Sequence, residues 1–281
     1  MSRPTVLITG ASTGIGNSCA HRLDTAGWRV FGTVRRQEDA DRLIRESDGR
    51  VIPLQCDISD PNDVAATARR IEEECGARGL AGLVNNAGIA IAGPMEFLPL
   101  DELRRQLEVN VTGHVAMTQA MLPLLRRAQG RIVFMSSISG RSALPFMGAY
   151  AASKFALEAI ADSWRVELRP WQIRVSLVEP GVIVTPIWST ATGAADANLA
   201  RMPKEVDTYY GKPLAALRKR LERGLKGNPP EDVAAVVEHA LTARRPRTRY
   251  VVGNDARMRL LLTRLPTSLR DRMVSAAVNR M

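Results

Sequence analysis

The start of the chain constrains the fold more than any other segment. Residues 5–9 read Thr-Val-Leu-Ile-Thr, an apolar strand pattern, and Gly10, Gly14 and Gly16 follow before a helical pattern that extends to about residue 26. Glycines let the backbone turn sharply and approach a ligand closely. The free N–H groups and the dipole at the start of a helix attract an anion. A strand, a glycine-rich turn and a helix in this order predict a phosphate-binding turn in an α/β fold.

Strand and helix patterns alternate along the rest of the chain. Apolar runs predict strands near residues 5–9, 29–34, 51–55, 81–85, 131–136, 173–179 and 249–252. Amphipathic patterns predict helices near residues 15–26, 38–46, 61–75, 100–127, 149–169 and 230–242. Such alternation is typical of a Rossmann-type doubly wound parallel sheet with helices on both faces. Since the chain has 281 residues, of which 45% are hydrophobic, we expect a single α/β domain over residues 1–281.

Three residues in the second half of the chain form a candidate proton-transfer site. Tyr150 and Lys154 are four residues apart in Tyr-Ala-Ala-Ser-Lys, so a helix places them on one face. A free tyrosine titrates near ~10, and a neighbouring cation lowers its pKa. Ser137, thirteen residues before Tyr150, can hydrogen-bond the oxygen of a carbonyl or alcohol held against the phenol. The three residues therefore predict chemistry that moves a proton on and off an oxygen.

Taken together, the motifs resemble those of the short-chain dehydrogenase/reductase family, in the branch of the hydroxysteroid and retinol dehydrogenases. The resemblance extends over about residues 6–185 and rests on several separate motifs. They are Thr9-Gly10-x-x-x-Gly14-Ile15-Gly16, Asp57, Asn85-Asn86-Ala87-Gly88, Asn110, Ser137, Tyr150-x-x-x-Lys154, and Pro180-Gly181 with Thr185. The resemblance implies an NAD(P)-dependent oxidoreductase that interconverts carbonyl and alcohol groups by hydride transfer.

The resemblance also implies a role for each residue of the catalytic set. Tyr150 would be the general acid for carbonyl reduction and the general base for alcohol oxidation. Lys154 would lower the pKa of Tyr150 and bind the nicotinamide ribose, and Ser137 would polarise the substrate oxygen. Asn110 would disturb its own helix and hold a water molecule in a proton relay. Glu158, on the same predicted helix as Tyr150, is expected at the solvent or at an interface rather than in catalysis.

The lining of the cofactor site follows from the same resemblance. The glycine-rich turn is expected to contact the pyrophosphate and the adenosine ribose, and Asp57 the adenine. Residues after the fourth strand are expected on the adenosine side, and residues after the sixth strand at the nicotinamide amide. The expected lining, to which Tyr150 and Lys154 also belong, is Gly10, Ser12, Gly14, Ile15, Gly16, Arg35, Asp57, Asn85, Asn86, Ala87, Gly88, Pro180, Gly181, Val182 and Thr185.

The end of the second predicted strand indicates which nicotinamide cofactor the chain prefers. Family members that prefer NAD carry an acidic residue there, which grips the 2′-hydroxyl of the adenosine ribose. This chain has Val34 in that place, followed by Arg35 and Arg36. Because arginine is suited to a 2′-phosphate, we expect NADP(H), with Arg35 as the main contact and NAD(H) as the alternative. If both arginines face solvent, this reason for the preference disappears.

Residues 186–228 interrupt the alternation and are predicted to form a substrate lid. The stretch is long, polar and irregular, with breakers such as Gly211 and Pro213, and loops of this length are usually functional or disordered. Its apolar residues, with two that precede the candidate catalytic tyrosine, predict a pocket for a hydrophobic ketone, aldehyde or alcohol that is steroid-, retinoid- or lipid-like. These residues are Ile187, Trp188, Leu199, Met202, Tyr209 and Tyr210, with Phe146 and Met147.

The excess of basic residues is concentrated at the C-terminal end. The net charge is +10, yet residues 1–211 hold 23 Lys and Arg and 23 Asp and Glu, so the whole excess lies in residues 212–281. We predict a C-terminal helical extension over about residues 254–281, with one or two amphipathic basic helices. They either cover the substrate pocket or a subunit interface, or attach peripherally to an anionic membrane. Nucleic-acid binding is not expected, since the chain has no recognisable module or aromatic platform for it.

Other features of the sequence narrow the setting. Cys19, Cys56 and Cys75 have no paired or metal-ligand spacing and the three histidines are scattered, so we expect no metal site. We recognise no signal peptide and no membrane span, and expect a cytoplasmic protein with peripheral membrane contact as the alternative. By analogy with the family, the helices near residues 100–127 and 149–169 are expected to pair between subunits of a homodimer or homotetramer.

Two other functions remain open from the sequence. A cofactor-sensing binding protein without turnover could have the same fold, although such proteins usually lack the tyrosine or the lysine that this chain retains. A membrane-associated protein could act through the basic tail alone.

Overall fold

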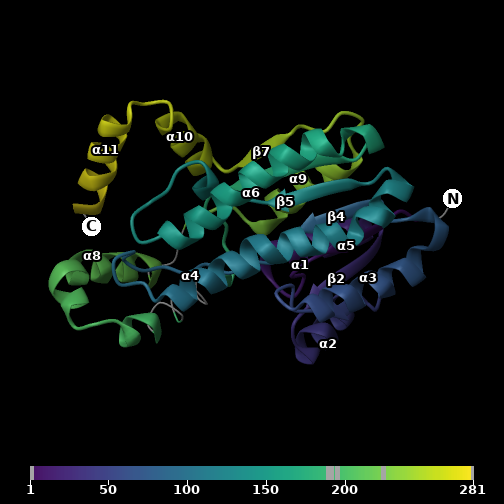
Figure 1. Cartoon of the computed structure of the whole chain (residues 1–281), viewed down its shortest axis with the longest axis horizontal. Helices are drawn as coiled ribbons and strands as arrows, with labels where there is room; N and C mark the ends of the chain where they lie inside the picture. The colour runs from purple at the N-terminus through teal and green to yellow at the C-terminus, as the bar shows by residue number, and fades with distance from the viewer. Residues whose placement is uncertain (1–2, 188–192, 194–196, 223–225, 280–281) are drawn as a thin grey trace.

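The structure is a computed structural model that describes residues 3–187, 193, 197–222 and 226–279. Seven parallel strands form one sheet in the order β3-β2-β1-β4-β5-β6-β7, at the centre of the molecule (Figure 1). The strands, each at a predicted position, are β1 (Thr5–Ile8), β2 (Arg29–Val34), β3 (Ile52–Gln55), β4 (Gly82–Asn85), β5 (Arg131–Met135), β6 (Arg174–Pro180) and β7 (Arg249–Val252). The strand order reverses between β1 and β4, and ligands of such sheets bind at the carboxyl ends of the strands beside that point.

Helices cover both faces of the sheet. The helices are α1 (Gly14–Thr25), α2 (Gln37–Glu46), α3 (Pro61–Cys75), α4 (Leu100–Leu107), α5 (Gly113–Ala128), α6 (Gly148–Glu167), α8 (Glu205–Glu222), α9 (Pro230–Thr242), α10 (Asn254–Leu262) and α11 (Thr267–Asn279). α1, α2 and α9 pack on one face, where Val6 and Ile8 are buried. α3, α5 and α6 pack on the other face, against residues such as Leu7 and Leu83. The predicted doubly wound parallel sheet is therefore confirmed.

The predicted helix over residues 100–127 is divided into two. A π-helical turn, Glu108–Thr112, joins α4 to α5. Such a turn adds a residue to the helical repeat and is frequent at functional sites. Asn110 lies in the middle of this turn, so it does sit where its helix is disturbed.

The predicted lid contains more regular structure than the sequence indicated. α8 runs through Gly211 and Pro213, the residues that suggested an irregular segment. The helix persists because it is anchored at its start, where Met202 and Val206 are buried in a hydrophobic cluster. Burial of two such side chains is enough to offset the cost of about 3 kcal/mol for a proline within a helix. Trp188, expected in the same lid, lies outside the described residues.

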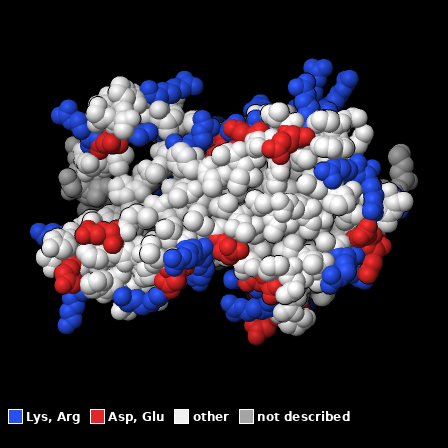
Figure 2. All heavy atoms as spheres, viewed as in Figure 1, with Lys and Arg blue, Asp and Glu red and all other residues white. Residues whose placement is uncertain are grey.

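Two helices, α10 and α11, form the predicted C-terminal extension. They follow β7 and lie at the end of the molecule opposite the N-terminus (Figure 1). Lys and Arg side chains gather over them on the face that Figure 2 shows. The apolar side chains of Met258, Leu261, Leu269 and Met273 are nevertheless exposed. No helix in the described part of the chain is long and apolar enough to cross a bilayer.

Candidate active site

A cavity of about 460 Å³ lies along the carboxyl ends of the strands. Its wall is formed by the loops that follow β1 to β6, by α6, by Arg105 of α4 and Val109 of the π-helical turn, and by one residue of α10. Parallel strands bring all these loops to the same edge of the sheet, beside the switch point between β1 and β4. Of the residues that the sequence predicted for catalysis and cofactor binding, all except Gly16, Asn85 and Asn110 line this cavity.

The turn after β1 approaches its neighbours so closely that side chains do not fit. Gly10 has a φ of +67°, in the left-handed region, and a Cβ there would lie 2.8 Å from the Cα of Ala87. Gly16, predicted to line the cofactor, instead shapes the turn from behind, since a Cβ there would lie 2.5 Å from Asn86 Nδ2. Thr13 precedes α1 without a side-chain cap. The N–H groups of the first helical turn are therefore available to an anion.

The residues after β4 hold this turn in place. Asn86 Nδ2 donates to the carbonyl oxygens of Thr9 and Gly10, both at 3.0 Å. Thr9 Oγ1 accepts from the N–H of Asn86 at 2.9 Å. Asn85 was expected on the adenosine side and is not there: it is buried, and its Nδ2 donates to Thr118 Oγ1 at 2.8 Å. The reason is that successive residues of a strand point to opposite faces of the sheet.

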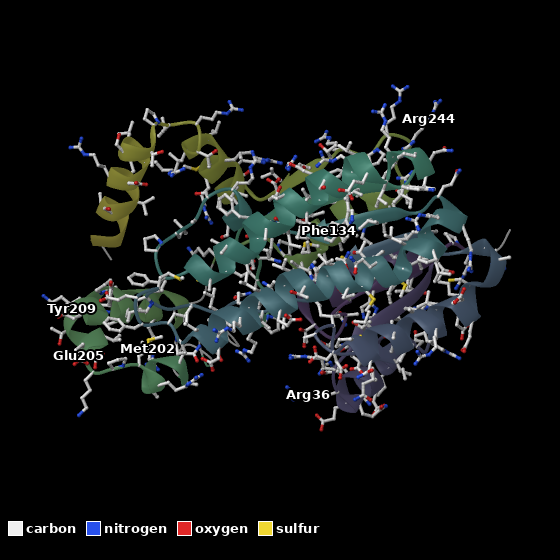
Figure 3. All side chains as sticks on the ribbon, in the orientation of Figure 1. Arg36, Phe134, Met202, Glu205, Tyr209 and Arg244 are labelled. Carbon is white, nitrogen blue, oxygen red and sulfur yellow. The ribbon has the colours of Figure 1, made fainter. Side chains whose placement is uncertain are left out.

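Arg35 and Asp57 lie on the β2–β3 side of the cavity. Arg35 is exposed on the cavity wall, whereas Arg36 begins α2 at the lower edge of the molecule (Figure 3). Asp57 Oδ1 accepts from the N–H and the hydroxyl of Ser59, at 2.9 and 2.6 Å. Burial raises the pKa of Asp57, but these hydrogen bonds and the charge of Arg35 outweigh burial and lower it overall. Asp60 rather than Asp57 caps the start of α3.

Tyr150, Lys154 and Ser137 meet on the β5–β6 side of the cavity. Tyr150 and Lys154 are one turn apart on α6, and the lysine Nζ lies 5.7 Å from the centroid of the tyrosine ring. Ser137 follows β5, and its Oγ accepts from the N–H of Ser139 at 3.1 Å. All three side chains are buried in the protein and line the cavity. The spacing in the sequence thus identified three residues that the fold brings together.

The charge state of this group differs from the expectation. Burial raises the pKa of Tyr150, which a hydrogen bond with Ser137 and the charge of Arg259 oppose. Lys154, expected to lower that pKa, instead directs its Nζ to the carbonyl oxygen of Met135 at 2.8 Å. Burial lowers the pKa of Lys154 to about 8, and the charge of Glu158 acts in the opposite direction. At pH 7 the phenol is therefore neutral and the lysine mostly charged.

Asn110 lies behind these three residues and does not reach the cavity. Its Oδ1 accepts from the N–H of Ile89 at 2.9 Å, and its Nδ2 donates to the Ile89 carbonyl oxygen at 3.0 Å and to Ser153 Oγ at 3.1 Å. Ile89 is on the cavity wall and Ser153 is on α6. Asn110 thereby ties the loop after β4 to the catalytic helix. A role in a water relay stays a prediction.

A cluster of buried charges lies beneath α6, and sequence reasoning missed it. Glu158 was expected at the solvent or at an interface, but it is buried. It accepts from Ser136 Oγ at 2.6 Å and pairs with Arg249 at 3.0 Å. Arg249, on β7, also pairs with Glu179 at 3.2 Å, and Arg141 approaches Glu179 at 3.4 Å. Burial raises the pKa of Glu179, and the charge of Glu158 adds to this effect. A glutamate inside the apolar β6 segment was the signal in the sequence.

The turn after β6 closes the cavity, with help from α10. Asp255 Oδ2 accepts from the N–H of Val182 at 2.8 Å. A Cβ at Gly181 would collide with the Asp255 carboxylate. Arg259, one turn further along α10, lines the cavity and was also missed. It is one of many arginines in a basic tail, and nothing in its sequence neighbourhood distinguishes it from the others.

Three of the aromatic residues expected in the substrate pocket, Phe146, Tyr209 and Tyr210, are not on the cavity wall. Tyr210 meets Phe97 and Phe146 edge-on, with ring centroids 6.0 and 6.1 Å apart, and Tyr209 stacks on Phe97 at 6.5 Å. Figure 3 shows Tyr209 and Met202 together at the α8 end of the molecule. The apolar wall is formed by Ile187, which the sequence predicted for the pocket, and by Ile89, Ala90, Ile91, Val182 and Ile183.

The residues present suit a dinucleotide. The glycine turn leaves no side chain between the backbone and a pyrophosphate, and the start of α1 supplies N–H groups. Arg35 and Asp57 stand on one side of this turn, and Tyr150 and Lys154 on the other. A dinucleotide with its pyrophosphate at the glycine turn would therefore have one nucleotide beside Arg35 and Asp57 and the other beside Tyr150 and Lys154.

The chain is similar in sequence and in fold to known proteins. The family model of the short chain dehydrogenases matches residues 4–195. The chain is 38% identical to retinol dehydrogenase 5 of Mus musculus, over 90% of this chain and 81% of that protein. It is 38% identical to the NADPH-dependent 3-dehydrocapnine reductase of Ornithobacterium rhinotracheale, over 88% of this chain and 87% of that protein. A short-chain dehydrogenase from Streptomyces avermitilis superimposes with a TM-score of 0.79 at 29% identity, over 100% of this chain and 98% of that one.

These matches extend over the structure that forms the cavity. The family model spans β1 to β6 and every motif on which the resemblance rests. A retinol dehydrogenase is among the relatives, as the resemblance to that branch predicted. The chain therefore belongs to the short-chain dehydrogenase family and is an NAD(P)-dependent oxidoreductase.

Proposed function

We propose that the chain interconverts a hydrophobic ketone or aldehyde and the corresponding alcohol, with NADP(H) as cofactor. One observation carries the proposal: Tyr150, Ser137 and Lys154 stand on one side of the cavity, and Arg35 and the glycine turn stand toward the other. The bound nicotinamide supplies or accepts the hydride. A proton must also move to or from the substrate oxygen, and Tyr150 is the residue suited to this task.

Tyr150 is proposed as the general acid in reduction and the general base in oxidation. Because burial raises its pKa, the phenol holds its proton at neutral pH and can donate it. Lys154 and Arg259, on the same cavity wall, would stabilise the phenolate that donation leaves. The Ser137 hydroxyl is 3.5 Å from the Pro180 carbonyl oxygen, which is long for a hydrogen bond. The Ser137 hydroxyl also hydrogen-bonds the phenol of Tyr150, so a substrate oxygen held against the phenol would lie within its reach.

Lys154 is proposed to bind the ribose of the nicotinamide. An ammonium group has three donors, and one of them is used by the carbonyl oxygen of Met135. The other two remain for the ribose hydroxyls. A pKa of about 8 leaves the lysine mostly charged at pH 7, so it can act both as donor and as cation.

The preference for NADP(H) rests on the residues at the end of β2. Val34 is buried and carries no carboxylate that would repel a 2′-phosphate, and Arg35 is exposed on the cavity wall. Asp57 is the acidic group on this side, but its Oδ1 is engaged by Ser59. The relative whose name includes NADPH dependence supports the same preference.

The substrate is proposed to be steroid-, retinoid- or lipid-like. The isoleucines of the cavity wall exclude water from an apolar ligand, and one relative is named a retinol dehydrogenase. We propose the segment 186–228, with α8, as the lid over this substrate. Its aromatic cluster, in which Tyr210 contacts Phe97 and Phe146, joins the lid to the loops after β4 and β5.

A homodimer or homotetramer is proposed on a separate observation. The centre of the face in Figure 2, where α5 and α6 lie in Figure 1, carries few charged side chains. Phe155 and Val166 of α6 are exposed apolar residues. Pairing of these helices between subunits would cover them. Light scattering at micromolar concentration tests the proposal, and a monomer would contradict it.

The test of the reaction is Tyr150→Phe, assayed with NADPH and a panel of hydrophobic ketones. We expect turnover to fall by about 10³-fold or more, since general acid catalysis contributes on the order of 10² to 10⁴. NADPH affinity should change little. Tyr210→Phe is the matched control and should retain its activity, because that hydroxyl bonds Glu96 on the surface. A Tyr150→Phe variant with most of its turnover, or a wild type inactive on the whole panel, would contradict the proposal.

The test of the cofactor preference is a titration with NADPH and with NADH. Arg35→Ala should weaken NADPH binding by about 10- to 100-fold, the range expected from a charge-assisted hydrogen bond, and leave NADH binding unchanged. Arg36→Ala, which removes the neighbouring charge at the start of α2, is the matched control and should change neither affinity by more than about twofold. Equal binding of both cofactors by the wild type would contradict the preference.

A further inference from the structure

Arg259 carries a positive charge from the C-terminal extension into the cavity. It lies on α10, beyond the residues that the family model matches. It lines the same cavity as Tyr150 and Ser137. The glycine turn needs no side chain from α10, and stabilising a phenolate at Tyr150 uses the charge of Arg259 but none of its hydrogen-bond donors.

The guanidinium of Arg259 is only partly satisfied by the protein. One Nη donates to the carbonyl oxygen of Ser142, in the loop between Ser137 and Tyr150. The Nε is buried and has no hydrogen-bond partner among the described residues. A buried donor without an acceptor is unfavourable. The side chain also lines the cavity, and among the described residues only one Nη has an acceptor, so the other Nη can donate to a ligand.

The protein does not neutralise this arginine by a direct pair with a carboxylate on its own helix. Asp255, one turn earlier on α10, is held by the N–H of Val182 at 2.8 Å. Burial lowers the pKa of Arg259, while the charges of Asp255 and of an ionised Tyr150 raise it. Arg259 thus remains a cation whose charge acts on the reacting group, on a wall otherwise rich in isoleucine.

We propose that Arg259 binds an anionic oxygen group of the substrate, such as a carboxylate, while Tyr150 acts on the carbonyl or alcohol of the same molecule. The inference rests on the proposed function and narrows its substrate class. The substrate would be amphiphilic, with an apolar chain along the isoleucine wall and an acid group near the reacting carbon, as in a fatty keto acid or hydroxy acid. A wholly neutral substrate would leave the charge of Arg259 without a counter-charge from the substrate.

Binding tests the inference without turnover. Protein saturated with NADPH is titrated by calorimetry with decanoate and with decanamide, which share a chain and differ in charge. The wild type should bind decanoate at least about tenfold more tightly, as expected for one charge-assisted hydrogen bond. Arg259→Leu should bring this ratio to about one, and Arg259→Lys should retain part of it. Equal binding of both probes by the wild type, or an unchanged ratio in Arg259→Leu, would overturn the inference.

Arg257→Leu is the matched control. Arg257 lies two residues earlier on α10, is exposed, and bonds Asn254 Oδ1 at 3.3 Å. Its removal takes the same charge from the same helix and should leave the decanoate preference unchanged. Thermal unfolding and NADPH titration of every variant establish that each one is folded and loaded.

Kinetics separates this role from an effect on Tyr150. With 4-oxodecanoate and its methyl ester as substrates, Arg259→Leu should raise KM for the acid by about tenfold or more and change the ester much less. Equal losses for both, with a shifted pH profile of kcat, would mean that Arg259 acts only through Tyr150 and would overturn the inference. If decanoate binds through Arg259 but no carbonyl compound is turned over, the proposed function fails and the anion site stands.

Discussion

Two regions of the molecule differ in which side chains they bury and which they expose. We call them the body, which is the sheet with the helices that cover its faces, and the outer helices, which are α8, α10 and α11. Within the sheet body, charges are buried in pairs, as where Arg249 lies between Glu158 and Glu179 at 3.0 and 3.2 Å. On α10, apolar side chains face solvent instead, and Met258 and Leu261 are 67% and 59% exposed. The body thus buries its charges against its own residues, whereas the outer helices present apolar surfaces that no described residue covers.

The two regions also contribute different residues to the cavity. The body holds the glycine turn and the proposed catalytic residues Tyr150, Lys154 and Ser137. The outer helices contribute little to that machinery, but α10 supplies Arg259 to the substrate side. Substitutions in the body should therefore change folding and cofactor binding, and substitutions in the outer helices should change what is bound.

The largest effect on stability is expected from the buried His114 when the pH falls. Burial, with the charge of Lys154, lowers its pKa to about 3, against 6.5 for the free side chain. The unfolded chain therefore binds a proton between these values that the folded chain does not, so stability is lost as the pH falls from about 6.5 toward 3. The loss is about 4 kcal/mol for this one group.

His114→Gln tests this source of acid sensitivity. A glutamine can still donate to the carbonyl oxygen of Ala87, which His114 Nε2 contacts at 2.6 Å, but it does not titrate. Urea unfolding at several pH values should show a shallower loss of stability below pH 6.5 in the variant. His21→Gln, at a partly exposed position, is the control and should keep the slope of the wild type. An unchanged slope in His114→Gln would contradict the assignment.

The next largest effect is expected from Arg249→Leu. The change leaves the carboxylates of Glu158 and Glu179 buried near each other without their shared cation. We expect the free energy of unfolding to fall by about 2–4 kcal/mol, less than for a fully buried pair because Arg249 is partly exposed. Arg244→Leu, in the exposed loop after α9 (Figure 3), should cost less than about 0.5 kcal/mol. If both variants lost a similar free energy of unfolding, the buried ion pairs would not account for a difference in stability between the body and the surface.

The sequence predicted the sheet body well because local pattern and tertiary structure agree there. Each strand is an apolar run, and the glycine turn has no alternative conformation that fits its spacing. The prediction was wrong for α8, where Gly211 and Pro213 indicated an irregular segment. That helix is anchored by the burial of Met202 and Val206, and local propensity does not report on such distant contacts.

The same distinction explains which site residues could be found. Tyr150 and Lys154 are recognisable because their spacing on one helix creates the site. Arg259 is not, because it contacts Ser142, 117 residues away in the sequence. The predicted positions of Asn85 and Glu158 were wrong for another reason. Which face of a strand or helix is buried depends on the packing of its neighbours. A sequence pattern therefore predicts site residues that lie on one element, and does not predict those brought together from elements far apart in the sequence.

A smaller effect, with opposite signs in the two regions, is expected from replacing glycine by alanine. Gly16→Ala places a Cβ 2.5 Å from Asn86 Nδ2 and against the turn after β1, so it should cost about 1–3 kcal/mol of stability and weaken NADPH binding. Gly211→Ala, in α8, meets only Asp207 Cβ at 3.9 Å and should gain about 0.5–1 kcal/mol. Thermal unfolding of both variants measures the contrast. Equal signs would contradict the view that the body tolerates less change than the outer helices.

The smallest effect is expected in α11, from Leu269→Ser. Leu269 is 45% exposed, so the change should lower the free energy of unfolding by less than about 0.5 kcal/mol. Leu157→Ala, in the buried part of α6, should cost about 2–5 kcal/mol in the same urea experiment. The measurement is repeated at several protein concentrations, because a subunit interface would make the stability depend on concentration. A loss above about 1 kcal/mol in Leu269→Ser that grows with protein concentration would mean that α11 is buried between subunits, and the exposed outer helices would then be part of an assembled core.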